Sequence, residues 1–166
     1  SFEVFADDSP TMERQARKIA SWGPNVYVKI PVTNTLGEFS GPLIQRLAEA
    51  GVKLNVTAVF TLEQVGVVTA RFSSKTPAII SVFVGRIADT GRDQMPLMAE
   101  AASVMRMRPR AELLWASTRE LWNIFEAERA GCHIITVTDD VIAKLPLVGK
   151  DLGEFSLETV QQFFTD

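Results

Sequence analysis

The chain has few of the residues on which disulfide frameworks and metal sites depend. Its 166 residues include one cysteine, Cys132, and one histidine, His133. A single thiol can form neither an internal disulfide nor a thiolate zinc site, so nothing in these counts requires an oxidising compartment. A lone histidine in a strand-like segment excludes His-rich metal sites, and we interpret it as structural. We therefore expect no bound metal and a cytoplasmic protein.

Charge and hydrophobicity exclude further classes of protein. The 17 basic and 20 acidic side chains leave a formal net charge of -3, which offers no broad positive surface to nucleic acid or to an anionic membrane. The one basic cluster, at 105–110, contains a proline and precedes a strand-like segment, which indicates a solvated helix end or loop. No apolar segment reaches the roughly 20 residues of a membrane span, and the first residues lack the pattern of a signal peptide. We predict a soluble protein with neither a nucleic-acid nor a membrane partner.

Short apolar runs alternate with helix-favouring segments along the whole chain. With 46% hydrophobic residues the chain can build the core of one domain, which we expect to span residues 1–166. The predicted strands are 2–6, 26–30, 53–59, 79–84, 112–116 and 133–137. The predicted helices are 9–22, 40–50, 61–71, 94–107, 118–130, 139–144 and 156–164. Such alternation, with mostly buried strands, is typical of an α/β fold with a parallel sheet covered by helices.

The number of units bears on the type of α/β fold. The pattern contains about six βα units, whereas a closed (β/α)8 barrel of the TIM type has eight. The chain also starts without methionine and with a strand-like segment close to Ser1. We predict a barrel domain that is incomplete at its N-terminus. The last helix carries Phe163 and Phe164, which need an apolar surface in this chain or in a neighbour, so we expect a homo-oligomer.

Lys29 is the most informative single residue. It lies in an apolar, β-branched segment, 26–33, that is typical of a strand buried on both faces. An amine placed there must either reach water or lose solvation, and desolvation disfavours its charged form. A neutral amine can attack a carbonyl carbon and form a Schiff base. The alternative is a strand-end lysine whose ammonium group lies in solvent.

Strand alternation places further polar groups on the face that Lys29 occupies. Side chains alternate across a strand, so Lys29 points away from the face of Val28 and Ile30. In the same way, Glu3 alternates with Phe2 and Val4, and Asn55 and Thr57 alternate with Leu54, Val56 and Ala58. Ser81 alternates with Ile80 and Val82, and Ser117 alternates with Leu114 and Ala116. Active sites of such barrels lie at the carboxyl ends of the strands, so we predict a functional cluster there. A hydrogen-bond network that serves only stability is the alternative.

Two arginines come just after predicted strands. Arg86 follows the strand at 79–84, and Arg119 follows the strand at 112–116. A guanidinium group at each position could bind a phosphate in bidentate fashion, assisted by the N-terminus of a helix that starts near Thr118. The alternative for either arginine is a surface salt bridge. No Walker-type loop and no G-x-G-x-x-G motif is present, so nothing in the sequence indicates a nucleotide.

Four segments that carry these residues resemble one known family. They are 26–33, with the sequence VYVKIPVT, 54–60, with LNVTAVF, 80–87, with ISVFVGRI, and 116–119, with ASTR. All four resemble the transaldolase and fructose-6-phosphate aldolase family of class I aldolase barrels. The resemblance runs in register from Phe2 to about the C-terminal helix and so covers nearly the whole chain.

The resemblance implies roles for individual residues. The lysine that matches Lys29 forms the Schiff base, while the residues that match Glu3 and Thr57 move protons through a bound water. A glutamate at the position of Glu3 is typical of transaldolases, whereas the aldolase branch has glutamine there. The residues that match Asn55, Ser81 and Ser117 hold hydroxyl groups of the substrate. The residues that match Arg86 and Arg119 bind its phosphate.

The implied activity is the transfer of a dihydroxyacetone unit between sugar phosphates, as in the pentose phosphate reactions of carbohydrate metabolism. The lysine adduct acts as the electron sink, so the resemblance implies neither a metal nor an organic cofactor. Two alternatives stay open: simple cleavage by a fructose-6-phosphate type aldolase, and a non-catalytic barrel fragment that binds sugar phosphates. The acceptor and donor sugars are not specified by the residues.

The chain also departs from the family pattern. The first two strands of the family carry an aspartate that acts as acid and base in carbon–carbon cleavage, and an asparagine that orients the intermediate. Neither has a counterpart here, so we expect weak or no turnover from residues 1–166 alone. The missing strands would belong either to a longer gene product or to another chain. Thr118 is a second departure, because the family often has an aromatic residue there.

Overall fold

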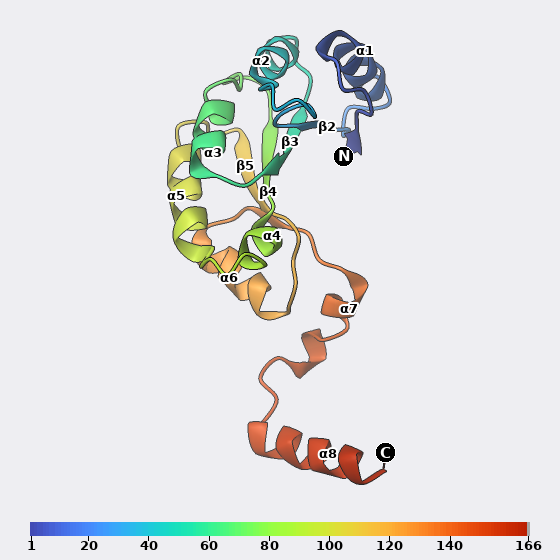
Figure 1. Ribbon diagram of the computed structural model, residues 1–166, viewed down its shortest axis with the longest axis vertical. Helices are drawn as coiled ribbons and strands as arrows, with labels where there is room; N and C mark the ends of the chain where they lie inside the picture. Colours follow the sequence, from blue (N-terminus) through green and yellow to red (C-terminus); the bar gives the residue numbers. More distant parts are fainter. Residues whose placement is uncertain (166) are drawn as a thin grey trace.

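The alternating segments form a six-stranded parallel sheet with a layer of helices over one face (Figure 1). The structure is a computed structural model and describes residues 1–165. The strands are β1 (Phe2–Glu3), β2 (Val28–Pro31), β3 (Leu54–Val59), β4 (Ala78–Val82), β5 (Ala111–Trp115) and β6 (Ile134–Ile135). The helices are α1 (Ser9–Ala20), α2 (Gly41–Glu49), α3 (Leu62–Thr69), α4 (Val84–Ala88), α5 (Met95–Met105), α6 (Trp122–Ala130), α7 (Asp139–Ile142), the 3-10 turn η1 (Leu145–Leu147) and α8 (Leu152–Thr165).

The strands lie in the sheet in the order in which they occur in the chain, β1-β2-β3-β4-β5-β6, and each pair of neighbours is parallel. Each connection between neighbouring strands contains a helix, as parallel pairing requires. The predicted α/β fold with about six βα units is confirmed. It is the arrangement of part of a TIM-type barrel, in which the described residues leave β1 and β6 as the two edges of the sheet.

The two faces of the sheet have different packing. On the outer face, strand residues such as Val28, Ile80 and Leu113 are fully buried against apolar side chains of the covering helices. A much smaller cluster lies on the inner face, where Ile79, Leu114 and Ala116 pack with Tyr27, Phe83 and Ile134. The main core therefore lies between sheet and helices, and the inner face has room for polar side chains.

The boundaries differ from the prediction where a strand has only one neighbour. The segments predicted at 2–6 and 133–137 contain strands of two residues, β1 and β6. Pairing continues past both, because the amide of Val4 donates to the carbonyl of Lys29 and the amide of Thr136 donates to the carbonyl of Trp115. The edges of the sheet are thus paired on one side only, and their regular strand geometry ends early.

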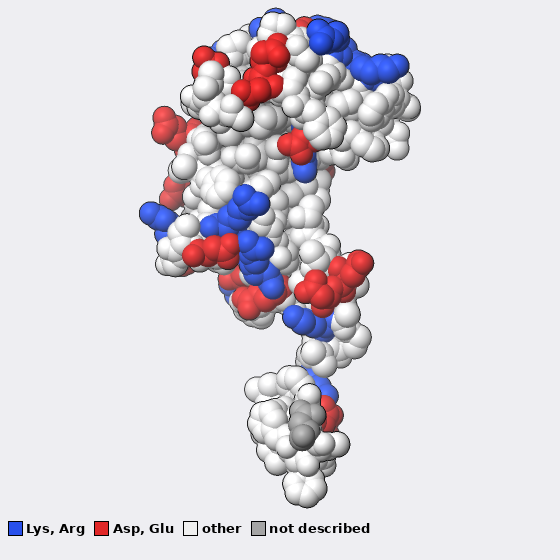
Figure 2. All heavy atoms as spheres, turned by 45° about the vertical axis from the view of Figure 1, so that its right-hand side comes forward, with Lys and Arg blue, Asp and Glu red and all other residues white. Residues whose placement is uncertain are grey.

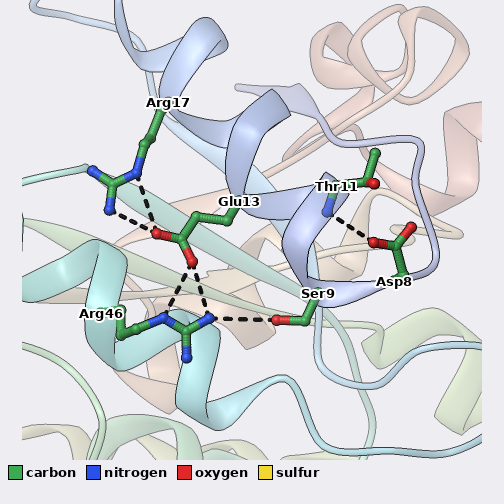
Figure 3. A network of polar contacts seen from close by, with 6 residues as sticks. All are labelled: Asp8, Ser9, Thr11, Glu13, Arg17 and Arg46. Atoms are coloured by element: carbon green, nitrogen blue, oxygen red, sulfur yellow. Dashed lines mark hydrogen bonds and ion pairs between the residues drawn. The ribbon is translucent and has the colours of Figure 1, made fainter.

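Ion pairs on the surface hold α1 against α2. The Glu13 carboxylate accepts hydrogen bonds from Arg17, one turn along α1, and from Arg46 on α2 (Figure 3). These hydrogen bonds lower the pKa of Glu13 below its ordinary value. Asp8 caps the start of α1 by accepting from the amide of Thr11. The ion pairs thereby join the helices that follow β1 and β2.

The C-terminal segment extends away from the sheet (Figure 1). α8 has no buried residue, and its large apolar side chains are exposed, with Phe164 94% exposed. The face of α8 seen in Figure 2 carries few charged atoms. The helix predicted at 156–164 exists and starts earlier, at Leu152. No helix within residues 1–165 combines the length and the apolar composition that crossing a membrane requires.

Candidate active site

Lys29 lies on the inner face of the sheet, in the middle of β2. Its neighbours Val28 and Ile30 are fully buried on the outer face, while Lys29 itself is half-buried. The register pairs Lys29 with Glu3 of β1 on one side and with Asn55 of β3 on the other. Adjacent strands lie about 4.8 Å apart, so the three residues form one row across the sheet. Within residues 1–165, the side-chain amine of Lys29 makes no hydrogen bond and no ion pair.

Asn55 and Ser81 form a buried polar chain beside Lys29. The hydroxyl of Ser81 donates to the side-chain oxygen of Asn55 over 2.7 Å, and the Asn55 amide donates to the hydroxyl of Ser1 over 3.1 Å. Asn55 is 4% exposed and Ser81 is 2% exposed. These hydrogen bonds fix the orientation of the Asn55 side chain, which a buried amide needs if it is to be satisfied.

Thr57 differs from Asn55 and Ser81 because its hydroxyl has no partner within residues 1–165. The residue is 3% exposed, and its Oγ1 forms no hydrogen bond with any described group. It lies two residues after Asn55 on β3, so it shares the inner face, and the register pairs it with Pro31. A buried hydroxyl without a partner is costly, and such groups in folded proteins call for an explanation such as a bound water or a ligand.

Glu3 is the most exposed member of the row. It occupies the edge strand β1, and its carboxylate forms no ion pair with Lys29 in the part of the chain that the structure describes. The two residues are direct neighbours in register without contact between their charged groups. Sequence alternation predicted their common face, and the parallel register of β1 and β2 agrees with it.

The predicted alternation was wrong on β5. Leu114 and Ala116 belong to the inner cluster, while Leu113 and Trp115 face the helices. Ser117 was predicted to share the inner face by alternating with Leu114 and Ala116. Its backbone has φ 61°, in the left-handed region, so regular alternation ends at this residue. The direction of the Ser117 side chain is therefore set by a turn of the backbone at the end of β5 and not by strand alternation.

A second non-glycine residue with a left-handed backbone lies at the end of β3. Ala58 has φ 57°, and the register between β3 and β4 shifts at this point. Ala58 was predicted to face the helices with Leu54 and Val56; instead the following residue, Val59, is the one in the outer core. Strained residues of this kind concentrate at functional sites. Both strained positions lie at carboxyl ends of strands, on either side of β4.

The two arginines come from the connections after β4 and β5. Arg86 was predicted to follow a strand in a loop, whereas it lies on the short helix α4 with its guanidinium group 5.4 Å from the ring centre of Phe83. Arg119 donates to Asp89 over 2.6 Å, and both side chains are about half exposed. Because α6 starts at Trp122, the helix N-terminus predicted near Thr118 is not there.

Gly85 brings the two connections into contact. An added Cβ at this glycine would lie 1.6 Å from the carbonyl oxygen of Ser117 and 3.1 Å from Cγ of Arg119. Only a residue without a side chain allows this approach. The segment with Arg86 therefore packs directly on the segment with Ser117 and Arg119.

Sequence reasoning missed Asn123 and Asp89. The side-chain oxygen of the buried Asn123 accepts from the amides of Arg119 and Glu120, and its own amide donates to Glu126. This hydrogen bonding replaces the helical turn that was predicted from Thr118. The available signals were the spacing of Asn123, four residues after Arg119, and of Asp89, three residues after Arg86. Thr118 points elsewhere, donating to the carbonyl of Thr136.

The cysteine and the histidine lie away from this cluster. Burial raises the pKa of the Cys132 thiol to about 12, so the thiol stays protonated at neutral pH. Nδ1 of His133 accepts a hydrogen bond from the amide of Leu113. Both residues directly precede β6, at the opposite end of the strands from the carboxyl ends described above.

Comparison with known proteins decides the family. The family described as Transaldolase/Fructose-6-phosphate aldolase matches residues 1–166. The chain belongs to this family. "Probable transaldolase 2" of Listeria monocytogenes is 36% identical over 159 residues, which cover 93% of this chain and 69% of the relative. "Probable transaldolase" of Streptococcus agalactiae and of Methanococcus maripaludis are each 34% identical, covering 93% of this chain and 70% of each relative.

Membership of the transaldolase and fructose-6-phosphate aldolase family agrees with the fold. A parallel sheet in chain order, with helices on its outer face, is the frame that such a barrel uses. The inner face gathers an amine, an amide and hydroxyl groups, and the two guanidinium groups lie beyond the ends of β4 and β5. Such groups are suited to a polyhydroxylated, anionic substrate.

Proposed function

We propose that the chain is a Schiff-base-forming, transaldolase-like enzyme that transfers a dihydroxyacetone unit between sugar phosphates. One observation carries the proposal: Lys29 is held on the inner face of the sheet, in register between Glu3 and Asn55. The outer face of the same strands is apolar and buried. An amine on the polar face, near the carboxyl ends of parallel strands, supports the proposal, because barrel enzymes carry out their chemistry at these strand ends.

The proposed reaction starts with the neutral amine of Lys29. Its lone pair attacks the ketone carbon of the donor sugar and forms a carbinolamine, which loses water to give an iminium ion. Cleavage of the bond between the α and β carbons, as the β-hydroxyl loses its proton, sends its electron pair into the iminium group, leaving an enamine on Lys29 and releasing an aldehyde. A second aldehyde accepts the enamine carbon, and hydrolysis by water then frees the product and the amine.

Proton transfer during carbinolamine formation and loss of water is assigned to Glu3 and Thr57. The unpartnered hydroxyl of Thr57 supports this assignment, since it can bind the water that moves between amine and acid. Asn55, Ser81 and Ser117 would hold hydroxyl groups of the donor. Cleavage also needs a base on the sugar hydroxyl next to the bond that breaks, and none of these residues is assigned to that step.

Arg86 and Arg119 are proposed to bind the phosphate of the sugar. Both come from the connections after neighbouring strands, and Gly85 allows those connections to touch. A phosphate bound there orients the reacting carbons along the inner face. Arg119→Ala should therefore raise KM for fructose 6-phosphate far more than KM for free dihydroxyacetone. An equal increase for both substrates would argue against contact with the phosphate.

Trapping with borohydride tests the nucleophile. Reduction in the presence of fructose 6-phosphate should leave a sugar-derived mass on the peptide that contains Lys29, measured by mass spectrometry. Lys29→Met should abolish the label. The matched control is Lys53→Met, which removes a lysine just before β3 whose amine donates to the carbonyl of Pro24. This variant should keep the label on Lys29. A label on another lysine, or none on Lys29, would refute the proposal.

Transfer and simple cleavage share the Lys29 adduct. They differ in whether an aldehyde or a proton takes up the enamine, and the glutamate at position 3 favours transfer by resemblance to the transaldolase branch. Product analysis with and without an added aldehyde acceptor separates the two. Product that forms only with the acceptor supports transfer, whereas release of free dihydroxyacetone at the same rate without it assigns the chain to the aldolase branch.

We further propose that the protein is a homo-oligomer and acts in the cytoplasm. The exposed apolar side chains of α8, among them Phe163 and Phe164, support self-association, because large apolar patches mark contact surfaces. The single cysteine is compatible with a reducing compartment. Light scattering after size-exclusion chromatography should give a mass above 18.3 kDa that falls in Phe163→Ser. A monomeric mass for the unaltered protein would count against association.

A further inference from the structure

The short helix α4 places a basic and an acidic side chain on one face. Asp89 follows Arg86 by three residues, at the C-terminal end of α4, and residues three apart on a helix are neighbours. The Asp89 carboxylate accepts a hydrogen bond from Nη2 of Arg119 over 2.6 Å. Asp89 thus connects Arg119, from the loop after β5, to the face of α4 that carries Arg86.

Arg119 is also held at its stem and at its backbone. Its Cγ lies over Gly85, where an added Cβ would be only 3.1 Å away, and Gly85 is the residue before Arg86. Its amide donates to the side-chain oxygen of Asn123 over 3.0 Å. These contacts leave the guanidinium group of Arg119 unrestrained. Within residues 1–165, the acidic group that pairs with it is Asp89.

We propose that Asp89 is a positioning residue that holds Arg119 beside Arg86 and so builds a two-arginine phosphate site before the ligand arrives. This inference rests on the proposed function, in which both arginines bind the sugar phosphate. Two guanidinium groups repel each other, and a carboxylate paired with one of them offsets part of that repulsion. The hydrogen bond engages one nitrogen of Arg119, which leaves the other N–H groups of its fork to donate to phosphate oxygens.

The opposite role for Asp89 would be to mask Arg119 from phosphate. A carboxylate that competes with phosphate for Arg119 would weaken phosphate binding, so its removal would strengthen binding. Positioning predicts the reverse sign, because an unrestrained arginine loses rotamer freedom only when phosphate binds. Both partners are half exposed, so loss of the ion pair should change stability little, and the variants should fold.

Calorimetric titration with inorganic phosphate tests the sign without requiring turnover. Asp89→Asn should weaken phosphate binding by roughly two- to tenfold, the range expected for ordering one long side chain. Asp89→Glu, which keeps the carboxylate, should recover most of the affinity. The matched control is Glu120→Gln, which removes one negative charge next to Arg119 in the sequence, from a side chain that makes no hydrogen bond within residues 1–165. By charge alone it should leave affinity unchanged or raise it slightly.

Turnover gives a second measurement. Asp89→Asn should raise KM for fructose 6-phosphate and leave kcat, and the kinetics with free dihydroxyacetone, unchanged. Unchanged or tighter phosphate binding in Asp89→Asn, or equal weakening in Glu120→Gln, would overturn the positioning role. Arg119→Ala tests the phosphate site separately from the role of Asp89. If this variant keeps its affinity for phosphate, the proposed phosphate site itself is wrong, whatever Asp89 does.

Discussion

The outer and inner faces of the sheet are built from the same strands and have different tasks. On the outer face, residues such as Ile30, Val56 and Ile80 are fully buried and apolar. The residues next to them in the chain lie on the inner face: Lys29 before Ile30, Thr57 after Val56 and Ser81 after Ile80. Stability is concentrated where sheet and helices meet, which leaves the inner face free to hold polar groups that a purely structural core would avoid.

The largest expected effect tests the outer face. Ile80→Ala removes a fully buried side chain from the contact between β4 and the helices and should lower the free energy of unfolding by about 2–5 kcal/mol. Urea denaturation followed by circular dichroism measures the change. The matched control is Val67→Ala on the exposed side of α3, which should change stability by less than about 0.5 kcal/mol. A small effect at Ile80 would mean that the outer face does not carry the stability.

Ser81→Ala, on the inner face of the same strand, should have a smaller effect. It removes the donor to Asn55 and leaves a buried amide oxygen without that partner, which should cost about 1–3 kcal/mol. The same denaturation experiment applies, with the exposed Ser103→Ala of α5 as control. A loss as large as that of Ile80→Ala would remove the distinction between the two faces.

The distinction between faces was predicted correctly on β2 and wrongly on β5, where Leu114 faces inward although the strand is regular. Val28, Lys29 and Ile30 follow strict alternation, and the structure places them on the expected faces. Alternation also failed where the backbone leaves the strand conformation. The left-handed residues Ala58 and Ser117 carry side chains that usually avoid this conformation, so nothing in their identity indicated the change of face.

The other differences between prediction and structure have three causes: a very short helix, a local side-chain cap and a contact between segments. α4 has five residues, too few for a recognisable helical period, so Arg86 was expected in a loop. The start of α6 was predicted four residues too early, because the side chain of Asn123 binds the amides of Arg119 and Glu120 in place of a helical turn. A contact between segments, such as that of Gly85 with Ser117, depends on the folded backbone and cannot be inferred from spacing.

The helix layer behind the outer face offers a smaller effect that depends on pH. Glu13→Gln removes the charge that joins α1 to α2 and should cost about 0.5–1 kcal/mol at neutral pH, since the arginines are half exposed. Hydrogen bonds from Arg17 and Arg46 lower the pKa of Glu13 in the folded state. The stabilisation is therefore present above the unfolded-state pKa and is lost as pH falls through the folded-state pKa.

Measurement of unfolding free energies at several pH values checks this sign. The difference between the unaltered protein and Glu13→Gln should shrink towards zero in acid, and added salt should reduce it at neutral pH. Glu63→Gln, on the exposed side of α3 and without an ion pair within residues 1–165, serves as control. A difference that persists unchanged in acid would mean that packing of the Glu13 side chain, and not its charge, holds the two helices together.

Thr57→Val should have the smallest effect on stability and a large effect on chemistry. Valine keeps the shape of threonine and removes a buried hydroxyl that has no partner in the part of the chain that the structure describes. The free energy of unfolding should therefore fall by less than about 0.5 kcal/mol. The rate of borohydride trapping at Lys29 should nevertheless fall, because the proposed proton transfer loses its hydroxyl. Ser81→Ala should differ from it by its larger cost in stability, since the Ser81 hydroxyl donates to Asn55. If Thr57→Val were destabilising and trapped sugar at the normal rate, its hydroxyl would be structural, and the inner face would differ from the outer face only in polarity.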